Sequence, residues 1–227
     1  MRTNRYPGAA VSPRRPGRAA PPAEAVAHLR AADPRLAELI DRTGPVEFPL
    51  EPDLWWALVD AICAQQLSVK AAATILGRVE ALAPEGRRPT PEEILALPDE
   101  TLRACGFSRS KTVYVKDLAA RWLDGTLRPD EIPELPDEEV VRVLTQVKGI
   151  GRWTAEMILI FTLGRPDVFP TDDLGIRVAV QRLAGLPERP GKAEMERIAE
   201  PWRPWRTLAS RYLWKSLSGT PPIAPPG

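Results

Sequence analysis

The chain has 227 residues, of which 44% are hydrophobic and 27% are charged. This composition is typical of a globular protein with a buried core, and no apolar run approaches the ~20 residues that cross a bilayer. We therefore expect no membrane partner. Two cysteines (Cys63 and Cys105) and one histidine (His28) are too few for a four-cysteine iron–sulfur cluster, a zinc site or a Ser-His triad.

The net charge of +1 is unevenly distributed. Residues 1–22 contain five arginines and no acidic residue, so the remainder of the chain carries a net charge of −4. A nearly neutral body does not attract nucleic acid over long distances, and any such contact must come from a local patch. The Pro, Gly and Ala content of residues 1–22 predicts a disordered basic arm, with an organelle transit peptide as the alternative. Residues 219–227 predict a flexible tail.

Hydrophobic residues recur at intervals of three and four along most of the chain, and no stretch shows sustained alternation. We therefore expect an all-α fold. Asp53 opens one of the predicted helices, Ser68 can cap the next, and Thr90 begins a capping box. Asp137-Glu138-Glu139 are predicted to cap the helix that starts at residue 140. We expect Trp55 and Trp56 in the core rather than at a stacking surface. The predicted helices cover residues 23–31, 34–42, 53–62, 69–82, 90–97, 99–105, 107–123, 140–147, 155–162, 174–183, 192–199 and 204–217.

A tight turn, Lys148-Gly149-Ile150-Gly151, separates two apolar helical segments in residues 140–163. Two glycines two residues apart let the backbone turn sharply and leave N–H groups at the start of the second helix. Such groups, with the positive end of the helix dipole behind them, suit one phosphate of a nucleic-acid backbone. A plain helix–loop–helix connection is the alternative.

Two adjacent acidic residues, Asp172 and Asp173, follow a short loop and precede the next apolar helix. From the spacing alone they are either a helix cap with a dipole-stabilised neighbour or a catalytic carboxylate.

Four segments of the chain are informative in their order: QQLSVKAA (65–72), GIGRWTA (149–155), DVFPTDDLGIR (167–177) and EPWRPWRTLASRYLW (200–214). Together they resemble the helix-hairpin-helix (HhH-GPD) superfamily of DNA glycosylases, and within it the 3-methyladenine DNA glycosylase II branch, which excises alkylated bases. The resemblance covers about residues 50–217 and implies two helical lobes with a DNA cleft between them. Residues 68–173 would form the central lobe with the hairpin, and residues 23–67 and 174–218 the other. The N-terminal β-rich domain that many relatives carry has no room here, so we expect a short form.

The resemblance assigns the chemistry to Asp173, and it leaves Asp172 to hold the start of the helix. Trp153 and Trp214 correspond to aromatic residues that bracket the flipped base, and a cationic base gains roughly 0.5–2 kcal/mol from each such face. Met157 stands where the family has a tyrosine, which leaves the substrate range open. The alternative for each tryptophan is a plug in a helix interface.

The same resemblance predicts the contacts with DNA. Gln66, with Leu67 as its neighbour, would be the wedge that enters the base stack, and a polar helix-end cap is the alternative. Lys148, Gly149, Gly151 and Arg152 would bind phosphate, and the carbonyls of Thr145, Val147 and Gly149 would hold a monovalent cation. Cations near the last helix, at Arg203, Arg206, Arg211 and Lys215, are either a further DNA contact or a solvated face.

These expectations combine into a monofunctional glycosylase that hydrolyses the N-glycosidic bond of 3-methyladenine and 7-methylguanine in double-stranded DNA. The position that a lyase lysine would occupy after the hairpin holds Trp153. We expect a monomer in the cytoplasm, associated with the nucleoid, that requires no cofactor; the cation at the hairpin would assist DNA binding. The alternatives are a glycosylase for deaminated, mismatched or etheno bases and a DNA-binding protein without catalysis.

Overall fold

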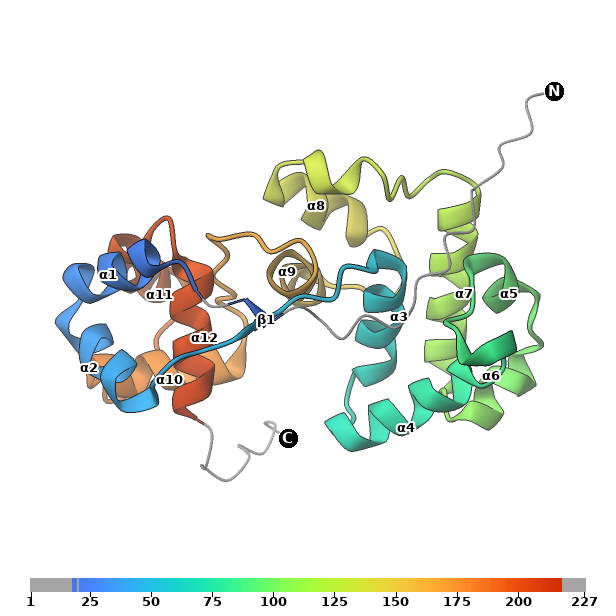
Figure 1. Ribbon diagram of the computed structural model, residues 1–227, viewed down its shortest axis with the longest axis horizontal. Coiled ribbons are helices and arrows are strands. Elements are labelled where there is room, and N and C mark those ends of the chain that lie inside the picture. The colour runs from blue at the N-terminus through green and yellow to red at the C-terminus, as the bar shows by residue number, and fades with distance from the viewer. Residues whose placement is uncertain (1–17, 20, 218–227) are drawn as a thin grey trace.

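The computed structural model describes residues 18–19 and 21–217 (Figure 1). The all-α class is confirmed, and the described exception is a two-residue antiparallel pairing of β1 (Arg18–Ala19) with β2 (Phe48–Pro49). The α-helices are α1 (Ala23–Ala32), α2 (Pro34–Thr43), α3 (Leu54–Ala64), α4 (Val69–Glu80), α5 (Pro91–Ala96), α6 (Asp99–Cys105), α7 (Arg109–Leu123), α8 (Asp137–Leu144), α9 (Arg152–Phe161), α10 (Leu174–Ala184), α11 (Lys192–Ala199) and α12 (Arg206–Ser216). Short 3-10 helices lie at Pro84–Gly86, Ile132–Glu134 and Glu200–Trp202.

The prediction of a disordered arm over residues 1–22 is wrong at Arg18–Ala19, because backbone hydrogen bonds hold these two residues against β2. Residues 1–17 and 20 of the arm, and the predicted tail 219–227, lie outside the described residues. None of the helices in the described ranges is both long and apolar enough to span a membrane.

Short-range signals set the helix starts. The caps predicted at Ser68 and Thr90 are confirmed, and Asp53 opens α3 as predicted: these three side chains accept hydrogen bonds from backbone N–H groups in the first turns of α4, α5 and α3. Each cap satisfies one of the N–H groups that a helix start leaves without a partner. The Ser68 cap therefore fixes one end of the connection between α3 and α4, which spans only residues 65–68. The cap predicted at Asp137-Glu138-Glu139 is wrong, because these acids lie in the first turn of α8 and the residue before it, Pro136, makes no side-chain capping hydrogen bond.

Two hydrophobic cores hold the molecule together, and α9 belongs to the first of them. In Figure 1 the helices α1, α2, α10, α11 and α12 lie on one side of α9, and α3 to α7 lie on the other. The first core is formed by side chains of α3 to α9, among them Trp55 and Trp56, which are 7% and 4% exposed as expected for core residues. The second core is formed by α1, α2, α10, α11 and α12. Helix α3 thus packs with α4, α7 and α9, whereas the sequence-based boundary at residue 67 placed it in the other lobe. Trp214 of α12 lies against both cores.

Candidate active site

Asp173 lies where the loop from α9 enters α10, and it is itself the cap of that helix. Its Oδ1 accepts a hydrogen bond from the backbone N–H of Ile176 at 2.8 Å. The prediction that Asp172 holds the helix start is wrong: the capping side chain is that of Asp173, and Asp172 is exposed. The sequence could not separate the two because both acids precede the same apolar helix.

Two indole rings converge on this carboxylate from different helices. Nε1 of Trp153, in the first turn of α9, donates to Oδ2 of Asp173 at 2.8 Å. Nε1 of Trp214, near the end of α12, donates to Oδ1 at 3.0 Å. Three N–H donors therefore occupy a group with about four acceptor positions, which fixes its orientation and leaves capacity for one further partner. The structure thus brings to Asp173 two tryptophans that lie 20 and 41 positions away from it in the sequence.

The loop that carries Asp173 is fastened to the start of α12. The backbone N–H of Val168 donates to Thr207 Oγ1 at 2.9 Å, and that hydroxyl donates to the carbonyl of Arg165 at 2.6 Å. Asp167 accepts from Arg206 Nε at 2.7 Å and also pairs with Arg203. These two arginines therefore stabilise the loop, which favours a structural role for them over the DNA contact considered from the sequence.

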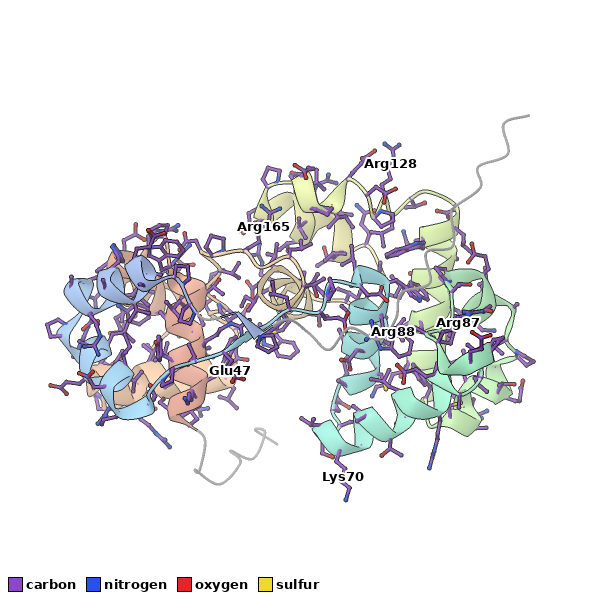
Figure 2. All side chains as sticks on the ribbon, in the orientation of Figure 1. Glu47, Lys70, Arg87, Arg88, Arg128 and Arg165 are labelled. Atoms are coloured by element: carbon purple, nitrogen blue, oxygen red, sulfur yellow. The ribbon has the colours of Figure 1, made fainter. Side chains whose placement is uncertain are left out.

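A cavity of about 520 Å³ opens beside Trp214, between the two cores, and its lining comes from three segments of the chain. The ring of Phe161 lies 5.8 Å from that of Trp214 at 31°, and the Arg211 guanidinium lies over Phe161 at 4.6 Å. Glu47 lies beside α12 in Figure 2. The lining residues are Pro45, Val46, Glu47, Phe161, Arg211, Trp214 and Lys215.

Helix α9 contributes a row of side chains to this interface. Trp153, Met157 and Phe161 are spaced by four residues, so they lie on one face of α9. Trp153 is 44% exposed, while Met157 and Phe161 are half-buried. Of the predicted base-pocket residues, Trp214 lines the cavity, whereas Trp153 and Met157 are not among its lining residues. Phe161 was missed in the sequence, although its spacing from Trp153 was the available signal.

Arg211 is another lining residue that the sequence analysis did not place in a pocket. It is 7% exposed, and its Nη1 donates to the carbonyl of Glu47 at 3.0 Å. Burial lowers the pKa of the Arg211 guanidinium to about 10. It is thus a cation at neutral pH, and it lies inside the molecule rather than on a solvated face of α12.

Helices α8 and α9 form the hairpin predicted around the two glycines. Lys148 donates its backbone N–H to Asp117 Oδ2 at 3.0 Å, and its ammonium, on a 60% exposed side chain, lies 3.4 Å from Asp117 Oδ1. Within the described part of the chain, the backbone N–H groups of Gly149 and Gly151 donate to no protein acceptor. These N–H groups lie at the start of a helix, where the dipole favours an anion.

Gly149 adopts a φ of +81°, and a Cβ at this position would lie 2.2 Å from the Tyr114 ring. Its carbonyl accepts a hydrogen bond from Gln65 Nε2 at 2.7 Å, and that of Val147 accepts from the backbone N–H of Ile150 at 3.1 Å. Two of the three predicted cation ligands, which include Thr145, therefore already have a donor. A carbonyl oxygen has a second lone pair, so the cation site stays a prediction.

Arg152 is directed away from the role predicted for it. Its guanidinium donates to Glu138 Oε1 at 3.0 Å and lies 3.6 Å from Glu156 Oε1. Glu156 is 7% exposed, and burial raises the pKa of its carboxyl to about 7 despite the nearby guanidinium. These ion pairs do not support phosphate binding by Arg152, because its guanidinium is already paired with two carboxylates of the hairpin helices.

The junction between α3 and α4 presents the predicted wedge. Gln66 is exposed and adopts a φ of +57°. Beside it, Leu67 and Val69 are exposed apolar side chains, 39% and 89% accessible. Lys70 extends away from the start of α4 in Figure 2. An exposed polar residue flanked by apolar ones and a cation is an arrangement that can enter a base stack next to phosphate.

The comparisons with known proteins agree with this fold. Residues 59–204 match the family model of the HhH-GPD superfamily of base excision DNA repair proteins, and the chain belongs to that superfamily. It is 40% identical over 205 residues to DNA-3-methyladenine glycosylase 1 of Schizosaccharomyces pombe, covering 87% of this chain and 90% of that protein.

Solved structures give the same result for the three-dimensional fold. The 3-methyladenine DNA glycosylase of S. pombe in complex with abasic DNA is similar with a TM-score of 0.78 and 39% identity, covering 86% of this chain and 96% of that one. The DNA-3-methyladenine glycosidase of Bacillus halodurans is similar with a TM-score of 0.78 and 35% identity, covering 90% and 93%.

Proposed function

We propose that the protein is a monofunctional DNA glycosylase of base excision repair that releases alkylated purines of the 3-methyladenine and 7-methylguanine type. The observation that carries this proposal is the Asp173 carboxylate, held between the indole N–H groups of Trp153 and Trp214. A relative at 40% identity is named for 3-methyladenine excision, which supports the substrate class.

The chemistry requires one well-placed carboxylate. Alkylation at a ring nitrogen makes the purine cationic, so its bond to C1′ is weak before the enzyme acts. As that bond breaks, its electron pair leaves with the base and positive charge develops on the sugar. The Asp173 carboxylate would stabilise this charge. A water oxygen then bonds to C1′, and its proton passes to Asp173 and on to solvent, which leaves an abasic site.

The flipped base would lie against the face of α9 that holds Trp153, Met157 and Phe161, with its leading edge toward the cavity beside Trp214. The cavity volume of about 520 Å³ lies in the range of small-ligand pockets, about 300–1,000 Å³. Trp214 connects the two parts of this site, because its N–H contacts Asp173 while its ring lines the cavity.

A second specificity, for neutral damaged bases, is favoured by the position of Arg211. Arg211 places a fixed positive charge in the cavity, and a like charge opposes the entry of a cationic base. Neutral damaged bases with an acceptor edge, such as hypoxanthine or ethenoadenine, would instead accept a hydrogen bond from this guanidinium. The replacement of tyrosine by Met157 also removes one electron-rich ring that would favour a cation.

DNA binding would use the hairpin and the α3–α4 junction, and the protein would act on the duplex as a monomer. The N–H groups of Gly149 and Gly151, which donate to no acceptor among the described residues, and the exposed Lys148 would contact phosphate. A monovalent cation at the hairpin carbonyls is a predicted bridge. Gln66, with Leu67 beside it, would fill the space left by the flipped nucleotide.

Base release from duplexes that each carry 3-methyladenine, 7-methylguanine, hypoxanthine or ethenoadenine tests this proposal. We expect release of the methylated bases, with strand breaks appearing only after alkaline treatment. Release of only the neutral damaged bases, hypoxanthine and ethenoadenine, would establish the second specificity. A strand nick formed before alkali would refute the monofunctional mechanism, and binding without release of any base would refute catalysis.

A further inference from the structure

The backbone of the predicted wedge is held in an uncommon conformation. Gln66 lies in the left-handed region at a φ of +57°, which non-glycine residues rarely adopt. Such a conformation persists only where the surrounding structure holds it in place. The contacts that hold this junction are made by two neighbours, Lys111 of α7 and Gln65, and neither has a role in the chemistry described above.

Lys111 closes the end of α3. Its ammonium donates to the carbonyl of Cys63 at 2.7 Å and to the carbonyl of Gln65 at 2.6 Å. The last carbonyls of a helix have no partner within the helix. Here one charged donor satisfies two carbonyls at the C-terminal end of α3, directly before Gln66. Lys111 is half-buried between α7 and this junction, so the contact is a defined one rather than a surface pairing.

Gln65 connects the same junction to the hairpin. Its side-chain Nε2 donates to the carbonyl of Gly149 at 2.7 Å, across 84 positions of sequence. Gly149 is in turn fixed against the Tyr114 ring of α7, because its Cα lies too close to that ring for any side chain. The wedge, the phosphate-binding turn and α7 are therefore linked through direct contacts.

We propose that Lys111 and Gln65 are positioning residues, which hold Gln66 in its inserting conformation at a fixed offset from the phosphate bound by the hairpin. This inference rests on the proposed function, since it assigns a step, the opening of the base pair, to contacts outside the catalytic group. A duplex bound at the hairpin would then meet a wedge that is already formed. We call the contacts of Lys111 and Gln65 with this junction the clamp. Without the clamp, Gln66 relaxes to a common backbone conformation, and the duplex binds without efficient flipping of the nucleotide.

Lys111→Met tests this, because it removes the ammonium and keeps most of the apolar stem. Lys116→Met is the matched control: Lys116 is on the same helix, and its ammonium pairs with Asp99 instead of the junction. Single-turnover release is measured for one lesion in two duplexes, one with the normal partner base and one with an abasic site opposite, where no base pair must be opened. Gln65→Leu tests the contact with the hairpin in the same way.

We expect Lys111→Met to reduce release from the paired duplex by about tenfold or more, the scale for loss of a charged hydrogen bond. Release from the unpaired duplex should fall by less than about threefold, and Lys111→Arg should recover most of the loss because it keeps a charged donor. Equal loss on both duplexes would show a general folding defect and would overturn the inference. Wild-type rates on both duplexes would overturn it as well.

A second readout separates this inference from the proposed chemistry. Fluorescence of 2-aminopurine next to the lesion reports unstacking and needs no base release. We expect the wild-type signal to be lost in Lys111→Met and kept in Lys116→Met, with duplex affinity changed by less than about twofold because the hairpin contacts remain. If wild type unstacks the lesion but releases no base, the proposed function fails while the clamp stands. If Lys111→Met unstacks like wild type, the clamp fails.

Discussion

Replacing Trp214 by phenylalanine tests how the candidate catalytic carboxylate is held. The change removes the indole N–H that lies 3.0 Å from Asp173 Oδ1 and keeps an aromatic ring against Phe161. A hydrogen bond to a charged group contributes about 1.5–3 kcal/mol. At about 1.36 kcal/mol for each factor of ten in rate, Trp214→Phe should slow base release by roughly 10- to 150-fold.

The same change at Trp153 provides an internal comparison. Trp153 donates to the other oxygen at 2.8 Å, but its side chain is 44% exposed, so water can replace the lost donor. We therefore expect Trp153→Phe to fall at the lower end of that range and below Trp214→Phe in effect. The assay is single-turnover release from a duplex with saturating enzyme, together with thermal unfolding to show that the fold is kept.

Full wild-type rates in both variants would refute the argument that these N–H groups orient the carboxylate. A combined Trp214→Phe, Asp173→Asn variant makes the test more specific. If the N–H acts through Asp173, Trp214→Phe should add little to the loss already caused by Asp173→Asn, because residues that act together are not additive.

Other predictions concern the hairpin, the loop, the buried acid and the cavity. Gly149→Ala should destabilise the fold by about 1–3 kcal/mol or more, because its Cβ would lie 2.2 Å from the Tyr114 ring at a positive φ; Gly151→Ala, with nothing within 4 Å, is the control in thermal unfolding. Thr207→Val should cost about 1–3 kcal/mol, because it leaves the buried N–H of Val168 without its partner, and chemical denaturation measures this. Burial raises the pKa of Glu156 from 4.5 to about 7, so the folded state binds the proton more tightly and stability is lost as pH rises between those values. Glu156→Gln should therefore be more stable than wild type above about pH 7 and lose that advantage toward pH 4.5; a constant difference across this range would contradict the assignment. Arg211→Met should raise the release of 7-methylguanine relative to hypoxanthine, because it removes a positive charge from the cavity, and an unchanged ratio in a competition assay would exclude that role.

Local signals in the sequence were enough to predict the helical class and several helix starts. Asp53, Ser68 and Thr90 cap the expected helices because a cap depends on residues two or three positions away. Signals over so few residues cannot predict which helices pack against each apolar face. Helix α3 was therefore assigned to the wrong side of the molecule, although its apolar face was recognised.

In the candidate site, too, local features could be predicted from the sequence and contacts between distant residues could not. The position of Asp173 at the start of α10 could be predicted, but which acid caps the helix depends on side-chain geometry that spacing does not contain. The cavity beside Trp214 joins residues 45–47 to Phe161 and Arg211, and such distant contacts leave little trace in a single sequence. Arg152 was predicted to bind phosphate because of its place in the motif, whereas its partners Glu138 and Glu156 become visible only in the fold.

The most direct test of the central claim compares Asp173→Asn with Asp172→Asn. Both substitutions remove one negative charge, but only Asp173 contacts the two indole N–H groups, while Asp172 is exposed. Single-turnover release from a methylated duplex should fall by at least about 10²–10³-fold in Asp173→Asn and stay within about twofold of wild type in Asp172→Asn, with duplex affinity kept in both. Comparable release by Asp173→Asn and wild type would contradict the assignment of the chemistry to this carboxylate.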